Sequence, residues 1–85
     1  MALNKEAERY NVVCAYKLAQ DNPHELMDIV SAARNRAEAC QMLMARWQLD
    51  ERCAHALLEM RSVRFTQEER EKVENELESL SSRLQ

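Results

Sequence analysis

Three cysteines and two histidines are the residues of this sequence best suited to bind a metal or attack a substrate: Cys14, Cys40, Cys53, His24 and His55. Structural zinc sites use paired ligands such as C-x₂-C with H-x₃-H. Cys53 and His55 are close in the chain, but residues two apart on a helix point in different directions. We therefore expect no metal site, and we interpret the cysteines as small buried thiols.

Two further kinds of chemistry compete with structural roles. A Cys–His nucleophilic pair needs a concave pocket and oxyanion donors, which a small helical chain without glycine rarely provides. Glu68, Glu69 and Glu71 could act as acid and base, but they lie where a helix is expected to begin, and the helix dipole favours negative charge there. Trp47 and the neighbouring methionines are typical of a core. We expect no catalytic residue, no cofactor and no enzyme activity in this chain.

The composition favours an all-α fold. The sequence has 85 residues, no glycine and one proline, and 46% of its residues are hydrophobic. β-rich and loop-rich folds use glycine and proline at their turns, so their scarcity argues against such folds. A chain of this length forms one domain, residues 1–85, and buries only about 60–65% of its unfolded surface. A second copy of the chain would therefore add stability.

Charge and cysteine content limit the functional classes. The net charge of −3 divides into −2 for residues 1–33, +2 for 34–66 and −3 for 67–85. The basic excess of 34–66 is small for a nucleic-acid-binding surface, so we expect DNA contact to be weak or indirect. The odd cysteine number and the lack of a signal-peptide pattern favour a cytoplasmic protein. No apolar run approaches the roughly 18 residues that cross a bilayer, so no membrane partner is expected.

Helix-start signals divide the chain into five expected helices. Three capping boxes begin at Asn22, Asn35 and Thr66, each with a glutamate three residues later, and Asp50 is a plainer fourth cap. Pro23 suits the first position of a helix. The expected helices are 3–20, 23–33, 36–47, 51–61 and 67–84.

The first and last helices carry narrow apolar seams, whereas the three short helices have wider apolar faces. A narrow seam is typical of pairing with one other helix. We therefore expect the two longer helices to pair antiparallel as a coiled-coil-like arm, with the short helices as a compact knob between them. The expected arm seam consists of Leu3, Tyr10, Cys14, Val73, Leu77, Leu80 and Leu84.

The run "LDERCAHALLEMRSVRFTQEEREKVENELESL" resembles the end of the coiled-coil arm in the A subunit of bacterial type IIA DNA topoisomerases, gyrase and topoisomerase IV. Upstream, "AQDNPHELMDIV" and "RAEACQMLMARWQL" are similar to further segments of that family, in the same order. The resemblance covers about residues 15–80. Gln48 and Gln67 stand where the family usually has glycine, and Ser62 and Glu68 where it has leucine.

The resemblance implies a role in the pairing of subunits. In that family the knob of one copy meets its twin from the other, and the two form the exit gate for transported DNA. Carried to this chain, it implies a homodimer, with other topoisomerase subunits as further possible partners, and a part in DNA topology change only within or through a full topoisomerase. The family's strand-cleaving tyrosine and metal-binding carboxylates have no match here. The expected interface consists of Ala54, Leu57, Leu58, Met60, Arg61, Val63 and Phe65.

Two other interpretations remain open from the sequence. The basic segment 34–64 could bind DNA directly or modulate a topoisomerase, since short helices joined by turns superficially resemble a helix-turn-helix. Alternatively, the seam of the last helix could be exposed and bind an unrelated helical protein.

Overall fold

The computed structural model describes the backbone of residues 2–84 and the side chains of 5–84. Within this part of the chain all regular structure is helical, so the all-α class is confirmed. The helices are α1 (Ala2–Asp21), α2 (Pro23–Ala32), α3 (Arg36–Trp47), α4 (Glu51–Leu58), the 3₁₀-helix η1 (Ser62–Phe65) and α5 (Gln67–Leu84). We call α1 and α5 the arm and residues 23–65 the head.

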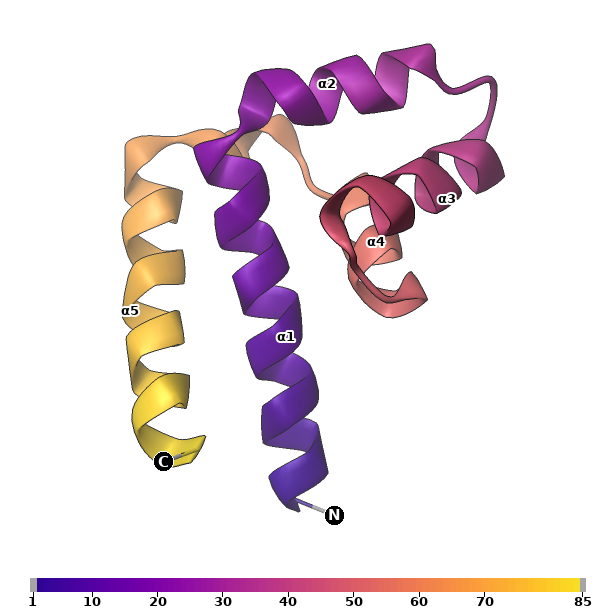
Figure 1. Ribbon diagram of the computed structural model, residues 1–85. Coiled ribbons are helices and arrows are strands. Elements are labelled where there is room, and N and C mark those ends of the chain that lie inside the picture. Colours follow the sequence, from indigo (N-terminus) through magenta and orange to yellow (C-terminus); the bar gives the residue numbers. More distant parts are fainter. Residues whose placement is uncertain (1, 85) are drawn as a thin grey trace.

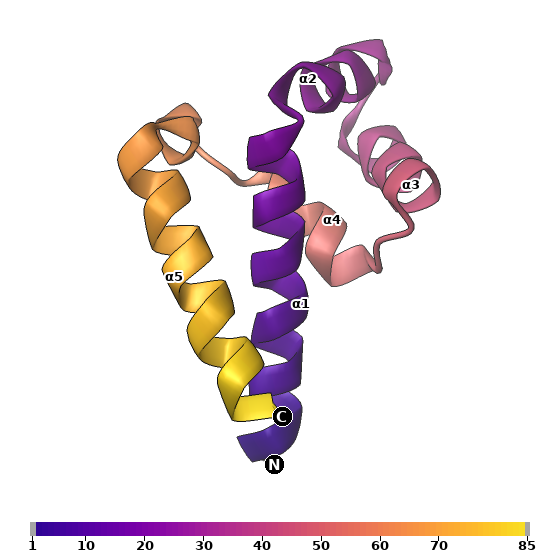
Figure 2. The same ribbon diagram turned by 60° about the vertical axis from the view of Figure 1, so that its left-hand side comes forward.

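The two arm helices lie side by side and run in opposite directions, and both chain ends lie at the same end of the molecule (Figures 1 and 2). Val13, Val73 and Leu80 are buried between them. Ion pairs span the contact: Arg9 Nε lies 2.6 Å from Glu76 Oε2, and Lys17 Nζ lies 3.3 Å from Glu74 Oε1. Apolar burial with charged pairs at its edges therefore holds the arm together.

The residues of this contact differ in part from the expected seam. On α1 the fully buried residue is Val13, whereas Cys14 lines a hollow between α1 and α4 beside Cys53 and Leu49. Cys14 lies one turn after Tyr10, at the edge of the arm contact, where it is half-buried and does not belong to the buried residues of that contact. Tyr10 and Leu77 pack against the buried arm residues, and Leu84 is half-buried. The side chain of Leu3 lies outside the described residues.

The head folds against one side of α1. Its core joins all three short helices to two alanines of α1, which allow close approach of the helices. The buried residues are Ala15, Ala19, Leu26, Ile29, Cys40, Leu43, Cys53, Ala54 and Leu57. The three cysteines are free thiols. Tyr16 packs against both this core and the arm contact, so it connects the two regions.

Side-chain caps begin two of the head helices as expected. The Asn35 side chain accepts a hydrogen bond from Glu38 N at 2.9 Å, and Asp50 accepts one from Cys53 N at 2.8 Å. The expected cap at Asn22 is wrong: its side chain donates to the Leu18 carbonyl at 2.9 Å and so closes α1, while Pro23 begins α2. The Thr66 bond to Glu69 N is long, at 3.4 Å.

Two junctions have a different shape from the one expected. α4 ends at Leu58 rather than at 61, and the chain then passes through an extended Arg61 into η1. Gln48 ends α3 with φ 55°, the left-handed conformation that usually favours glycine. Its N–H and that of Leu49 both donate to the Met44 carbonyl, so the turn forms despite the side chain.

The molecule is flat, with dimensions of 39 × 30 × 17 Å. Most apolar side chains of the described residues are only partly covered. Among the described residues, no helix combines the length and the hydropathy needed to span a membrane.

Candidate functional site

An apolar groove of about 360 Å³ opens on the head between α2, the end of α4 and η1. All but one of its lining residues are apolar. They are Pro23, Leu26, Met27, Val30, Leu57, Leu58, Met60, Ser62 and Phe65. We call this surface the head groove. Two of the elements that line it, α2 and η1, lie at the end of the molecule opposite the two chain termini (Figures 1 and 2).

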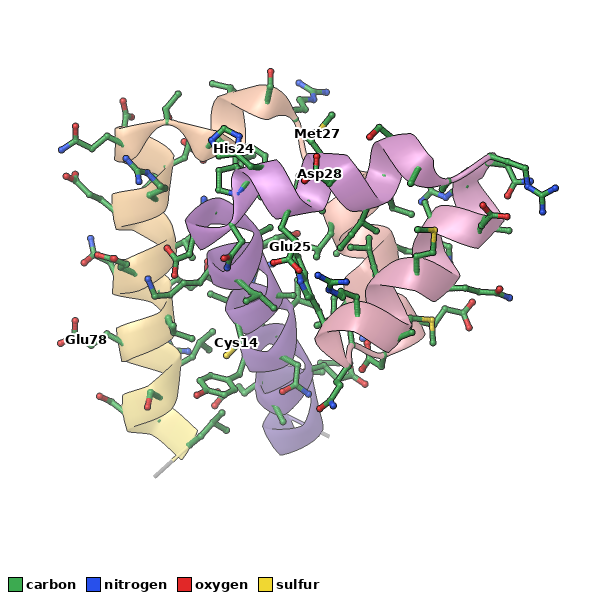
Figure 3. All side chains as sticks on the ribbon, turned by 45° about the horizontal axis from the view of Figure 1, so that its top comes forward. Cys14, His24, Glu25, Met27, Asp28 and Glu78 are labelled. Carbon is green, nitrogen blue, oxygen red and sulfur yellow. The ribbon has the colours of Figure 1, made fainter. Side chains whose placement is uncertain are left out.

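Two large apolar side chains beside the groove are exposed. Met27 is 60% exposed and Val63 is 58% exposed, and these are the only large hydrophobic residues so exposed in the described part of the chain. Figure 3 shows Met27 on the outer face of α2, near His24 and Asp28. Exposed apolar groups continuous with an apolar groove are typical of a protein-binding surface. The head groove is therefore the strongest candidate site.

The α2 side of the groove follows from helical spacing. Pro23, Leu26, Met27 and Val30 recur at steps of three, one and three, which places them on one stripe of the helix. Leu26 and Ile29 already supply the residues that α2 buries in the core. Pro23 and Met27 widen the apolar stripe beyond what the core covers. This excess was the sequence signal for the α2 side, which our expected interface omitted.

The residues of the expected interface fall into four groups. Leu58, Met60 and Phe65 line the groove, whereas the exposed Val63 and Arg61 line a neighbouring hollow with Tyr16. Leu57 forms part of its floor but is only 3% exposed. Ala54 is fully buried in the head core, so it offers no surface to a partner. Its spacing from Leu57 and Leu58 placed it on the apolar face of α4, and that face is turned into the core.

Hydrogen bonds and stacking fix η1 against the arm. The buried Gln20 side chain donates to the Arg64 carbonyl at 2.6 Å. The Arg64 guanidinium lies 4.9 Å from the centre of the Tyr16 ring, and its Nε lies 3.3 Å from Glu69 Oε1. Because η1 supplies Ser62 and Phe65 to the groove, these contacts set the position of that side.

Burial limits the reactivity of two of the three cysteines. Cys40 Sγ lies 3.8 Å from His55 Nε2, but Cys40 is only 5% exposed, so a substrate has no access to it. Burial raises the pKa of the Cys53 thiol to about 11, and its hydrogen bond with Asp50 adds to the effect. Cys53 is therefore protonated and unreactive at neutral pH. Within residues 2–84, no three histidine, cysteine or carboxylate side chains gather as a metal site.

Most arginines of the basic segment are neutralised by ion pairs. Arg34 contacts Glu38, Arg36 contacts Glu59, Arg46 contacts Glu25 and Arg52 contacts Glu8, with distances between 2.7 and 3.0 Å. These carboxylate partners compete with any DNA phosphate for the arginines.

The interpretation that the seam of the last helix binds an unrelated helical protein also loses its basis. Val73 and Leu80 of that seam are buried against α1.

No family model matches the chain. It is, however, similar to the A subunit of DNA gyrase from Campylobacter jejuni, with 34% identity over 82 residues, which is 96% of this chain and 10% of that protein. The chain is a relative of one segment of the gyrase A protein. The gyrase A proteins of Leptospira biflexa (36% over 78 residues) and Streptococcus pneumoniae (34% over 76 residues) match in the same way, over 92% and 89% of this chain and 9% of each protein.

These matches confirm the resemblance inferred from the sequence motifs. The chain spans about a tenth of the length of the gyrase A proteins that it matches. The matched region includes both the arm and the head, because it covers nearly the whole chain. The similarity to gyrase A thus applies to the complete fold, including the elements that build the head groove.

Proposed function

We propose that this gyrase A-like chain is a non-catalytic homodimerisation module, and that the head groove is the surface that meets the second copy. The observation that supports this most strongly is the apolar groove with exposed Met27 and Val63 beside it. A C2 interface requires one self-complementary surface that both copies share. A groove flanked by projecting apolar side chains meets this requirement, because the projection of one copy can fill the hollow of the other.

The exposed area of the chain agrees with a missing partner. A folded monomer of 10.0 kDa exposes about 5,200 Å² by the usual scaling with mass. This chain exposes 5935 Å². The excess of about 700 Å² is close to the roughly 800 Å² that each partner buries in a standard interface. Burying one such interface would thus reduce the exposed area of the chain to the value expected for a monomer of its mass.

The position of the groove suits a gate. It lies at the head, whereas the two arm ends lie at the far end of the molecule (Figure 1). Two heads can therefore meet while their arms lead away to other parts of a larger assembly. The resemblance to the A subunits of type IIA enzymes implies the exit gate as that contact. We propose that the chain acts on DNA topology only within or through a complete topoisomerase.

Sedimentation equilibrium over a dilution series up to high micromolar concentration tests the proposal. We expect a reversible dimer for the wild-type chain. Met27→Glu should give a monomer, because a buried interface would enclose an unpaired charge. Met27 is largely exposed in the single chain, so this variant should fold normally.

Ala45→Glu is the matched control, since it adds the same charge to an exposed helical position outside the groove. It should dimerise like the wild type. A wild-type chain that stays monomeric, or a Met27→Glu variant that dimerises as well as Ala45→Glu, would contradict the proposal.

A further inference from the structure

The methionines of the head differ in how far their side chains are covered. Among the side chains that the structure describes, Met27 is the one exposed methionine, at 60%. Met42, Met44 and Met60 are half-buried and pack against the head core. The Met44 sulfur lies 3.8 Å from Cys40 Sγ, which covers it further. A small oxidant therefore reaches the thioether of Met27 more readily than that of the other three.

Met27 also lies where a change of polarity has a large effect. It belongs to the lining of the head groove, in which Ser62 is the one polar residue of the described chain. Oxidation converts the apolar thioether of methionine into a polar sulfoxide. A sulfoxide oxygen that is buried without a hydrogen-bond donor is unfavourable. A sulfoxide at Met27 therefore opposes the burial of this surface.

We propose that Met27 is a site of reversible oxidation that controls dimerisation through the head groove, with a peroxide as the oxidant. The Met27 sulfur attacks one oxygen of hydrogen peroxide, and the O–O bond breaks as the S–O bond forms. The hydroxide that leaves takes up the proton of the transferred oxygen and departs as water. Sulfur is thereby oxidised by two electrons, and the peroxide is reduced. This inference rests on the proposed dimerisation and adds its regulation.

Dimerisation and oxidation of Met27 oppose each other. In the proposed dimer the second copy covers Met27, so the peroxide attacks the free chain, which a reversible dimer releases. The rate of Met27 oxidation should therefore fall as the protein concentration rises, whereas the rates at Met42 and Met44 should not change. Each dimer contains two copies of Met27. Oxidation of both should weaken the dimer about a hundredfold, because a polar group is buried twice.

Peroxide treatment followed by peptide mass spectrometry and sedimentation equilibrium tests the inference. At low protein concentration, Met27 should gain one oxygen atom before the other three methionines of the head. The oxidised chain should then dimerise about a hundredfold more weakly than the untreated chain. Treatment with a methionine sulfoxide reductase and a thiol reductant should restore the dimer, because it returns the thioether.

Met27→Leu is the matched control, because leucine is apolar and of similar volume but has no sulfur. This variant should dimerise like the wild type and keep its dimer after peroxide treatment. It retains Cys14, Cys40 and Cys53, so it also shows whether oxidation of the thiols affects dimerisation. Circular dichroism before and after treatment establishes that the helical fold is intact.

The outcomes separate this inference from the proposed function. A wild-type chain that is monomeric before treatment overturns both. A wild-type dimer that keeps its affinity with Met27 fully oxidised, while Met27→Glu is a monomer, overturns the regulation alone. Met27→Leu dimers that weaken under peroxide as much as the wild type also overturn it, because another group would then be responsible. Oxidation of Met27 no faster than that of Met42 and Met44 overturns it as well.

Discussion

The arm contact and the head groove contain similar side chains but use them differently. In the arm, Val13, Val73 and Leu80 are almost completely covered by the opposite helix, and ion pairs complete the edges. In the head, Met27 and Val63 remain exposed beside a groove that nothing in the described chain fills. The arm thus satisfies its apolar surface within one chain, whereas the head requires a second molecule.

The largest effect should come from truncating the arm contact. Leu80→Ala removes a side chain that is 5% exposed and leaves a cavity, so unfolding should become easier by about 2–4 kcal/mol. Met27→Ala, at an exposed position, should change the stability of the single chain by less than about 0.5 kcal/mol. Urea denaturation at low protein concentration measures both. Equal losses of stability from Leu80→Ala and Met27→Ala would contradict the claim that the arm is buried within one chain and the head groove is not.

A smaller effect is expected where the arm holds the groove in place. Gln20→Met keeps the shape of the side chain but removes the donor to the Arg64 carbonyl. Stability should fall by about 1 kcal/mol. Hydrogen exchange should show faster exchange at residues 62–66, because η1 loses its tie to α1. Unchanged exchange there would show that the remaining Arg64 contacts suffice.

Gln48→Gly should act in the opposite direction. Gln48 adopts a left-handed backbone with φ 55°, which glycine tolerates without strain. The gain should be about 0.5–1 kcal/mol, reduced by the greater flexibility of glycine in the unfolded chain. Thermal unfolding followed by circular dichroism measures it. A loss of stability would show that the Gln48 side chain stabilises the fold by more than the left-handed backbone destabilises it.

The smallest effect should depend on pH. The Arg9 guanidinium holds the pKa of Glu76 below its ordinary value. A carboxylate with a lowered folded pKa stabilises the fold above its unfolded pKa, and this contribution is lost as the pH falls through the folded pKa. Glu76→Gln should therefore cost about 0.5–1 kcal/mol at neutral pH, because the pair is partly exposed, and nothing measurable in strong acid.

The control for this prediction is Glu78→Gln, which makes the same substitution at an exposed position of the same helix. Denaturation across a pH series compares the two variants. A cost of Glu76→Gln that stays constant into strong acid would show that its effect is steric rather than electrostatic.

The sequence was informative wherever local chemistry decides the structure. The absence of glycine indicated helices, and the caps at Asn35 and Asp50 form as their side chains predict. It was less informative where several elements compete for one residue. Asn22 can cap α2 or close α1, and only the packed structure selects the second. Val13 and Cys14 are neighbours with similar hydropathy, and the crossing of α1 with α5 decides which is buried.

The candidate site could be predicted in part for the same reason. Leu58, Met60 and Phe65 follow from one continuous segment that resembles the family. The α2 side does not, because it becomes part of the groove only when α2 packs beside η1. Ala54 was misplaced since an apolar face of α4 can point to the core or to a partner, and spacing alone does not distinguish these.

The most direct test of the dimer surface follows the methionine methyl groups by NMR over a dilution series. Met27 and Met60 line the head groove, whereas Met42 and Met44 pack against the head core outside it. We predict that the Met27 and Met60 signals shift with concentration along one binding curve, while those of Met42 and Met44 stay constant. Signals that are independent of concentration, or that shift equally for all four residues, would contradict the head groove as the dimer surface.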